Sequence, residues 1–264
     1  MLKGAFHLHS TYSDGEFTLA QLREIFLSAG CRTACMTDHA ESFHLAKLAA
    51  YLEECTSLSD DRFRFVPGLE FECERKMHIL AYGMATLLST RDPEHVIRSI
   101  RASGGIAVIA HPKDDAFAWI ESFEELPDGI EVWNTKYDGR YAPRPGTFRL
   151  VQRLRQRKPD LLAFYGQDLH WRKQYRGITV EVGCASPEPQ EILQTLRRGN
   201  YVARNGKMEL PSSGAVSEEL LHRFSIVHQR SAWLRQWMRR VKNLADRFGI
   251  GIPLSVKAQL RRIF

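Results

Sequence analysis

The chain has few cysteines, and their spacing fits neither a disulfide framework nor a thiolate metal site. It contains five cysteines in 264 residues, with no Cys-x-x-Cys pair and with an odd one left over. This pattern argues against a small disulfide-stapled fold and against a structural zinc site of the thiolate type. We therefore expect reduced thiols and a cytoplasmic protein.

Long apolar runs are also missing. The longest stretches, such as residues 105–110, are far shorter than the about 20 residues that a membrane-spanning helix needs. One lysine followed by a histidine-bearing segment at the N-terminus argues against a secretory signal. An apolar content of 44% and a charged content of 26% are ordinary for a globular protein, and we expect no transmembrane segment.

The positive charge is confined to one end of the chain. From Pro211 onward there are ten Lys or Arg residues and three Asp or Glu residues, whereas the remainder is nearly neutral. The Pro-Ser-Ser-Gly break at 211–214 marks the expected boundary between a body over 1–210 and a basic amphipathic helical tail over 211–264. Three uses of the tail stay open: packing or dimerisation, contact with an anionic membrane surface, and contact with nucleic acid.

Short apolar runs alternate with amphipathic stretches throughout the body. This βα alternation predicts a mainly parallel sheet, and a closed barrel would place the strand C-termini on one face. We expect strands over 5–9, 33–37, 65–70, 77–82, 106–111, 129–132, 161–166 and 178–182, and helices over 19–29, 43–58, 93–102, 147–155 and 188–198.

Two pairs of ligand-type residues stand far apart in the sequence, each spaced i, i+2. They are His7 with His9, and Asp168 with His170. Side chains two apart leave the same face of an extended strand, so each pair directs both members to one point. The spacing predicts two strands that converge on a shared metal centre.

Five further imidazoles and carboxylates fall at or just beyond the ends of the expected strands. Nitrogen and oxygen donors suit Zn, Mn and Fe, and nine donors exceed what two ions need, so we expect three divalent ions. Taken singly, a buried histidine is more often a core residue, and an Asp in a Ser-Asp-Gly turn commonly caps its own backbone. The full candidate set is His7, His9, Asp14, His39, Glu70, His78, His111, Asp168 and His170.

The order of these motifs over residues 4–171 resembles the PHP (polymerase and histidinol phosphatase) family. The resemblance rests on His-x-His at 7–9, Ser-Asp-Gly at 13–15, Thr-Asp-His at 37–39, Pro-Gly-x-Glu at 67–70, a strand histidine at 78, Ala-His-Pro at 110–112 and Asp-x-His at 168–170. It implies a distorted (β/α)7 TIM-like barrel with a trinuclear centre, where a metal-bound hydroxide attacks a phosphate ester. It also implies one ion at His7, His9 and Asp168, with Glu70 bridging to a second ion at His78 and His111, and a third ion at Asp14, His39 and His170.

Other polar residues are candidates for handling the substrate. The loop after residue 132 is rich in cations and aromatics, and we expect Lys136, Arg140 and Arg144 to hold phosphate, with Trp133, Tyr137 or Tyr141 stacking on a leaving group. A solvated loop with packed aromatics is the alternative. Asp38 is expected to orient an imidazole. Further candidates are Lys113 and residues 171–173.

Three functions remain in view at this point. The first is metal-dependent hydrolysis of a phosphate ester of a small metabolite, such as a nucleotide, a sugar phosphate or an amino-alcohol phosphate. The second is an exonuclease or oligonucleotide phosphodiesterase that uses the same centre. The third is a non-catalytic scaffold whose ions serve folding or assembly, which the complete donor set disfavours.

Overall fold

Twelve strands of the described chain form two mixed sheets of six strands each. The computed structural model describes residues 1–247, apart from some side chains between 232 and 247. The first sheet has the order β12-β11-β10-β1-β2-β4, and the second has the order β3-β5-β6-β7-β8-β9. The strands of the first sheet are β1 (Leu2–Leu8), β2 (Thr33–Met36), β4 (Arg64–Val66), β10 (Thr179–Val182), β11 (Tyr201–Asn205) and β12 (Met208–Pro211); those of the second are β3 (Asp38–His39), β5 (Gly68–Glu72), β6 (His78–Tyr82), β7 (Ile106–Ala110), β8 (Gly129–Asn134) and β9 (Leu162–Gly166).

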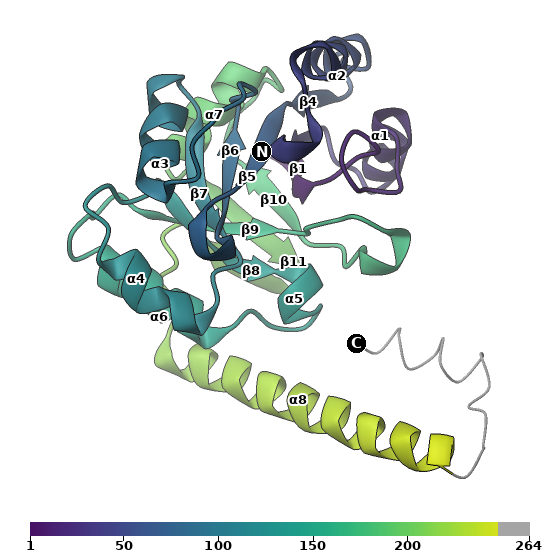
Figure 1. Ribbon diagram of the computed structural model, residues 1–264, viewed down its shortest axis with the longest axis vertical. Coiled ribbons are helices and arrows are strands. Elements are labelled where there is room, and N and C mark those ends of the chain that lie inside the picture. The colour runs from purple at the N-terminus through teal and green to yellow at the C-terminus, as the bar shows by residue number, and fades with distance from the viewer. Residues whose placement is uncertain (248–264) are drawn as a thin grey trace.

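Helices surround the strands, and each of the longer ones begins at a residue suited to that position (Figure 1). Thr18 and Gln21 form a capping box at the start of α1, and Asp92 caps α3, whose first residue is Pro93. The α-helices are α1 (Leu19–Ser28), α2 (Leu45–Ser57), α3 (Pro93–Ala102), α4 (Phe117–Glu121), α5 (Thr135–Asp138), α6 (Pro145–Leu154), α7 (Pro189–Arg197) and α8 (Glu218–Arg247), and single 3-10 turns span Ala40–Ser42, Glu74–Lys76, Asp114–Ala116 and Arg172–Gln174.

The expected strands and helices are found close to their predicted positions, but the sheets are less parallel than we expected. Strand β5 pairs with β6 in antiparallel register, as β6 does with β7 and β1 with β10. Only residues 73–77 connect β5 to β6, and a parallel crossover needs about a dozen residues or more. The predicted closed (β/α)7 barrel is not confirmed, because the two sheets are open.

The chain passes from the first sheet to the second at two single residues, Thr37 and Pro67. Thr37 separates β2 from β3, and Pro67 separates β4 from β5. Gly68 follows the second switch, where an added Cβ would lie 2.7 Å from the carbonyl oxygen of Met36, so only glycine allows this close approach. Backbone hydrogen bonds from Gln167 to Phe6 (3.0 Å) and from His9 to Leu169 (3.1 Å) join the sheets again beside β1.

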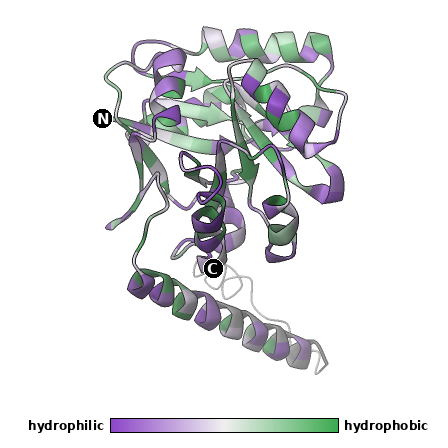
Figure 2. Ribbon diagram, turned by 90° about the vertical axis from the view of Figure 1, so that its left-hand side faces the viewer, coloured by the Kyte–Doolittle hydropathy of each residue, from purple (hydrophilic) through white to green (hydrophobic). Residues whose placement is uncertain are grey.

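The core fills the space between the sheets and the helices that cover them. All five residues of β7 are buried, and Figure 2 shows hydrophobic strands inside the body beneath helices that present both hydrophobic and hydrophilic residues. Five buried aromatic rings are among the largest core side chains. These rings belong to Trp133, Tyr51, Tyr82, Tyr165 and Phe6. They pack around the strands whose ends carry the candidate ligands.

Among the side chains of helix α8 that the structure describes, the buried ones lie in its first turns. Leu221 and Phe224 are buried, with the Phe224 ring 6.1 Å from that of Phe148, and His228 Nε2 lies 2.9 Å from the carbonyl oxygen of Ala142. Farther along, Trp233 is 65% exposed and Trp237 is 51% exposed, as the helix runs away from the body (Figure 1).

The predicted boundary at residue 211 falls on the last residue of β12, whose strand pairs with β11. The first turns of α8 pack against the body, whereas Trp233 and Trp237 farther along the helix are exposed. The predicted helix break at 249–253 and the basic ending lie outside the described residues. No helix among residues 1–247 is both long enough and apolar enough to cross a bilayer.

Candidate metal centre

All nine predicted donors lie in one cluster at the edge of the strands. The donor atoms form four groups, and within each group the atoms lie within 4.8 Å of one another. Together the four groups contain every predicted ligand. The donors come from both sheets. They lie at the edge where β1, β5, β7 and β9 end and where the antiparallel β6 begins. The groups are His9, Asp14, His39 and His170; His7, His9 and Asp168; His7, Glu70 and His111; and His39, Glu70 and His78.

Glu70 lies at the centre of this cluster. Its Oε1 is 2.8 Å from His78 Nδ1 and 3.3 Å from His111 Nε2. Its Oε2 is 3.2 Å from His9 Nε2, and it also lies 3.5 Å from one nitrogen of His7 and 3.5 Å from one of His39. One buried carboxylate thus contacts five imidazoles, which is the arrangement expected of a bridging ligand.

Two further carboxylates lie on the other side of the cluster. Asp168 Oδ1 is 3.1 Å from His170 Nδ1 and 3.6 Å from His9 Nε2. Asp14, whose side chain is 53% exposed, approaches His170 Nε2 to 3.2 Å. The Asp14 side of the centre is therefore open to solvent, whereas the side formed by Asp168 is closed.

Three donors have a left-handed backbone that residues other than glycine rarely adopt. The φ angles are 59° at His7, 31° at His111 and 51° at Asp168. Each such conformation costs about 1–3 kcal/mol and persists where the surrounding structure enforces it, often at functional sites. Its presence at three donors of one cluster indicates that the local fold is selected for where these side chains point.

Unpaired nitrogen atoms test whether the cluster suits metal ions. His7 Nε2 and both ring nitrogens of His9 are buried, and although Glu70 lies close to the two Nε2 atoms, no described residue is oriented to form a hydrogen bond with these three nitrogens. Buried polar atoms without partners are rare in folded proteins. Burial lowers the pKa of His9 to about 4, so this imidazole is neutral at pH 7, as a metal ligand must be. The donor set therefore fits divalent cations.

The two buried carboxylates of the cluster, Glu70 and Asp168, are held in the charged form. Burial opposes ionisation, but the neighbouring imidazoles, His7 foremost, keep the pKa of Glu70 and the pKa of Asp168 well below their usual range. Burial likewise opposes protonation of His7, but Glu131, Asp168 and Glu70 raise its pKa well above the ordinary value. Without ions, a proton on His7 offsets part of the negative charge of these carboxylates.

Glu131 is a functional residue that the sequence analysis did not single out. It is buried, and its Oε1 lies 2.7 Å from His7 Nδ1. Its Oε2 accepts hydrogen bonds from the backbone of His111 (2.9 Å) and from the side chain of Asn134 (2.9 Å). A carboxylate that accepts from one ring nitrogen of a ligating histidine fixes the other nitrogen toward the ion. Its position between the apolar residues Ile130 and Val132 of β8 was the available signal.

We expect Glu131→Gln to weaken metal binding by about 10- to 100-fold, because partners of this kind usually contribute that much. Glutamine preserves the shape but offers only one acceptor oxygen, so His7 or the backbone of His111 loses its partner. A competition titration of Mn²⁺ or Zn²⁺ against a chelating dye measures the effect. Glu24→Gln, on the exposed face of α1, is the matched control. Equal affinities in the two variants would contradict the role given to Glu131.

Asp38 has different partners from those that we predicted. Its carboxylate accepts hydrogen bonds from the backbone of Ser10 (2.7 Å) and from the hydroxyl groups of Ser10 and Ser13 (2.7–3.1 Å). In place of an imidazole, Asp38 thus holds the loop that carries Asp14. The prediction assumed that Asp38 and His39 continue one regular strand, whereas β3 is a two-residue strand that ends at His39.

The predicted substrate-binding residues separate into distinct environments. Lys136 Nζ lies 3.0 Å from Asp168 Oδ1, inside the cluster. Arg144 is held by Asp138 (2.6 Å) and by the carbonyl oxygen of Pro112 (2.9 Å). Arg140 is exposed, and its carbonyl oxygen accepts a hydrogen bond from Asn205.

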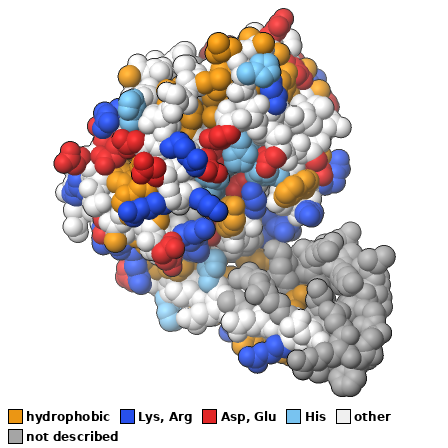
Figure 3. Space-filling model, viewed as in Figure 1, with side chains coloured by type: hydrophobic (Ala, Val, Ile, Leu, Met, Phe, Trp, Pro, Cys, Tyr) orange, Lys and Arg blue, Asp and Glu red, His pale blue; other side chains and the backbone are white. Residues whose placement is uncertain are grey.

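The aromatic residues of the same loop differ in the same way. Trp133 is buried and donates to the carbonyl oxygen of Gly139, so it packs in the core instead of stacking on a leaving group. Tyr137 is 57% exposed, and its ring lies 4.8 Å from that of His111. Tyr141 is also exposed. On this face of the molecule, Lys, Arg, Asp and Glu side chains gather around histidines (Figure 3).

Comparisons with known sequences give one modest similarity. No protein-family model matches the chain. In an alignment of 133 positions that covers 42% of this chain, it is 26% identical to the DNA polymerase/3'-5' exonuclease PolX of Bacillus subtilis. The matched part spans 23% of the length of PolX, so the activity of that whole protein does not transfer directly to this chain.

Comparisons with solved structures show the fold. A two-domain protein from Bacteroides vulgatus, described as containing a predicted PHP-like metal-dependent phosphoesterase, is 19% identical and has a TM-score of 0.57, with 84% of this chain and 68% of that one covered. An amidohydrolase from Chromobacterium violaceum with bound sulfate is 15% identical, with a TM-score of 0.50 over 75% of this chain and 96% of that one. PsfC from Pseudomonas syringae is 14% identical, with a TM-score of 0.50 over 87% and 98%.

These similarities agree with the motifs and with the geometry of the cluster. The ordered donor residues predicted the PHP family, and the fold is the one seen in a PHP-like protein. The resemblance to the PHP family is confirmed at the level of the fold: this chain has the fold seen in a PHP-like protein, and its nine candidate donor residues lie together in one cluster.

Proposed function

We propose that this chain hydrolyses a phosphate ester of a small metabolite, using divalent ions held by the nine donors. The observation that carries the proposal is one cluster in which five imidazoles surround a buried carboxylate, with unpaired histidine nitrogens facing inward. A scaffold would need no more than one ion, held in a site whose coordination positions are all filled by the protein. An open cluster of nine donors, with a half-exposed Asp14 at its edge, suits a centre that admits a substrate.

We assign three ions to three donor sets. His7, His9 and Asp168 would hold the first, Glu70 with His78 and His111 the second, and Asp14, His39 and His170 the third. Grouping of the donor atoms within 4.8 Å supports the first and third sets, and the contacts of Glu70 support the second. Nitrogen and oxygen donors without thiolates suit Zn, Mn or Fe. When bound, such ions activate water and neutralise charge on phosphate oxygens.

The side chains around the donors would bind and orient the ester. Burial opposes the charge on Lys136, but Asp168 raises the pKa of its ammonium, so Lys136 is a permanent cation beside the centre. It can donate to a phosphate oxygen while it remains in contact with Asp168. Arg144 is fixed by Asp138 and the carbonyl oxygen of Pro112, so its guanidinium loses little freedom when an anion binds nearby.

A second candidate is a phosphodiesterase that shortens oligonucleotides at the same centre. The similarity to PolX, whose name includes a 3'-5' exonuclease, favours keeping this candidate. The basic tail is its expected nucleic-acid contact, with an anionic membrane surface as the alternative partner. The two functions differ in whether the scissile phosphate carries one ester bond or two.

The test is hydrolysis of p-nitrophenyl phosphate and of bis(p-nitrophenyl) phosphate by the full chain loaded with Mn²⁺. We expect release of p-nitrophenol from the monoester, its loss to background after treatment with a chelator, and recovery when Mn²⁺ is restored. Preference for the bis-ester would favour the phosphodiesterase. If the metal-loaded chain hydrolyses neither compound nor a short oligonucleotide, the proposal is wrong, and a non-catalytic scaffold becomes the favoured function. If p-nitrophenyl phosphate is hydrolysed, a panel of phosphorylated metabolites then identifies the leaving group.

A further inference from the structure

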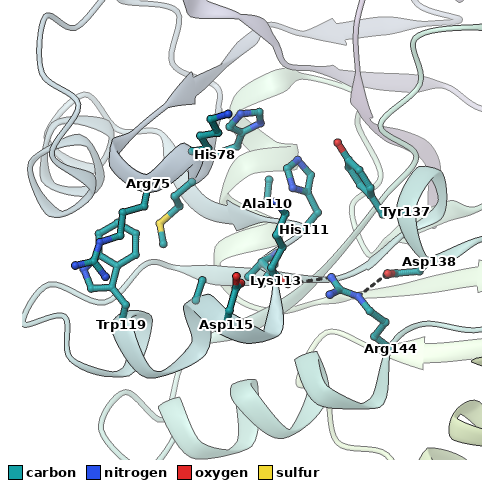
Figure 4. Close-up of a pocket in the computed structure, with 14 residues that line it drawn as sticks. Arg75, His78, Ala110, His111, Lys113, Asp115, Trp119, Tyr137, Asp138 and Arg144 are labelled. Carbon is teal, nitrogen blue, oxygen red and sulfur yellow. Dashed lines mark hydrogen bonds and ion pairs between the residues drawn. The ribbon is translucent and has the colours of Figure 1, made fainter.

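A cavity of about 390 Å³ borders the metal centre on the side of His78 and His111. The liquid volume of one water is about 30 Å³, so this space exceeds what one phosphate group fills. Its walls come from the loop between β5 and β6, the segment after β7, and helices α4 and α5 (Figure 4). A substrate bound at the centre would therefore extend into this cavity.

Positive charge dominates the lining. Arg75, Lys76 and Lys113 line the cavity, and none of the three forms an ion pair with a described residue. Two acids line it as well, but Asp138 is already paired with Arg144 (2.6 Å), which leaves Asp115 as the counter-charge. The cavity thus presents an excess of cations beside the centre that form no ion pair with a described residue.

The backbone at Arg75 and Lys76 is strained. Their φ angles are 53° and 55°, in the left-handed region that glycine adopts without penalty. A hydrogen bond from the backbone of Cys73 to the carbonyl oxygen of Met77 (2.7 Å) closes this loop. Glycine would suit both positions better for folding alone. Two long cations are found there instead, which points to a binding role for the loop.

Trp119 holds one of these cations in place. The Arg75 guanidinium lies 4.5 Å from the centre of the Trp119 ring, and that ring packs edge-on against Phe123 at 5.2 Å. Figure 4 shows the two side chains together at one end of the cavity. Stacking on an indole fixes the guanidinium plane and leaves its N–H groups free to bind an anion.

We propose that this cavity binds a second anionic group of the substrate, held by Arg75, Lys76 and Lys113. The inference rests on the proposed function and narrows the substrate to a phosphate ester that also carries a carboxylate or another phosphate. The ester phosphate lies at the metal centre, and the second anion lies beyond His78 and His111. The three cations select the substrate and take no part in bond breaking.

Phosphonates test this without any turnover, because their C–P bond is not an ester. Binding to the Mn²⁺-loaded full chain is measured by calorimetry for propylphosphonate, 3-phosphonopropionate, propane-1,3-bisphosphonate and pentane-1,5-bisphosphonate. A charged hydrogen bond contributes enough for about a tenfold change in affinity or more. We expect at least one of the probes with two anionic groups to bind about tenfold more tightly than propylphosphonate. Preference for the carboxylate or for the bisphosphonates identifies the second group.

Variants assign the preference to the cavity. We expect Arg75→Gln and Lys76→Gln each to reduce the preference for the probes with two anionic groups by about tenfold. The affinity for propylphosphonate should remain unchanged. Arg98→Gln, an exposed cation on α3 outside the cavity, should leave both unchanged.

Three results would overturn the proposal. They are no preference in the unaltered chain, a preference that survives both variants, and an equal loss for propylphosphonate, which would mean that these cations hold the ester phosphate. Failure of the proposed function is separate, since it appears as absent hydrolysis of p-nitrophenyl esters whatever the phosphonates do.

Discussion

Glu70→Gln is expected to lower phosphate-ester hydrolysis by at least about a thousandfold and to release bound ions. The ions supply several kcal/mol of charge stabilisation, and each 1.36 kcal/mol corresponds to about tenfold in rate. The Glu70 carboxylate touches histidines of both sheets, from His9 on one side to His78 on the other. An amide in its place keeps the volume but has no negative charge and only one oxygen to ligate.

The matched control for this variant is Glu72→Gln. Glu72 lies two residues farther along β5, is partly exposed and pairs with Arg91. Metal content by atomic emission and the rate with p-nitrophenyl phosphate should change at Glu70 and remain unaltered at Glu72. Melting temperatures of both variants check that the fold is intact. Full metal content and activity after Glu70→Gln would contradict a bridging role.

Gly166→Ala is expected to destabilise the chain by about 1–3 kcal/mol and to weaken metal binding at the same time. A methyl group at this position would overlap the Glu131 carboxylate and lie 2.6 Å from His7 Cβ, and both neighbours are buried. Glu131 cannot move aside without losing its contact with His7. One added carbon would therefore disturb the residue that orients a ligand.

Gly146→Ala serves as the control for this substitution. At Gly146, within α6, the new methyl group would meet only the side chain of the half-buried Phe117 and that of the exposed Asp114 at 3.2 Å or more. We expect its effect on stability to stay within about 1 kcal/mol, since alanine also favours the helix. Thermal unfolding and metal titration of both variants, side by side, make the comparison. A Gly166→Ala protein with unchanged melting and affinity would show that Glu131 has room to shift.

The donor set was predictable from the sequence because its members belong to short ordered motifs at strand ends. The i, i+2 spacing of His7 with His9 and of Asp168 with His170 was visible in the sequence. The alternation of a regular strand is not what aligns these side chains, however, because His7 and Asp168 have a left-handed backbone. The structure brings these pairs together through hydrogen bonds between β1 and the segment after β9. Element positions such as β7 followed equally from apolar periodicity.

Other features depend on tertiary geometry that no local pattern encodes. Glu131 lies between apolar residues of β8, and its contacts with His7 and His111 span 124 and 20 residues of the sequence. The sheet switches at Thr37 and Pro67 depend on close packing around Gly68. The strained backbone at Arg75 and Lys76 was invisible for the same reason, since a left-handed residue is read from φ and not from its side chain. The antiparallel pairing of β6, in contrast, follows from the short connection between β5 and β6, so loop length could have predicted it.

The left-handed conformation of His7, His111 and Asp168 lowers the stability of the fold, although the side chains of these residues are donors of the candidate metal centre. Glycine at His111 or Asp168 would relieve conformational strain while deleting a donor. A library of random variants sorted only for heat resistance, in medium depleted of divalent ions, should therefore lose the centre before it loses the core. Sorting in the presence of Mn²⁺ should reverse that drift, because an ion that binds only the native state rewards the very positions that are costly to fold.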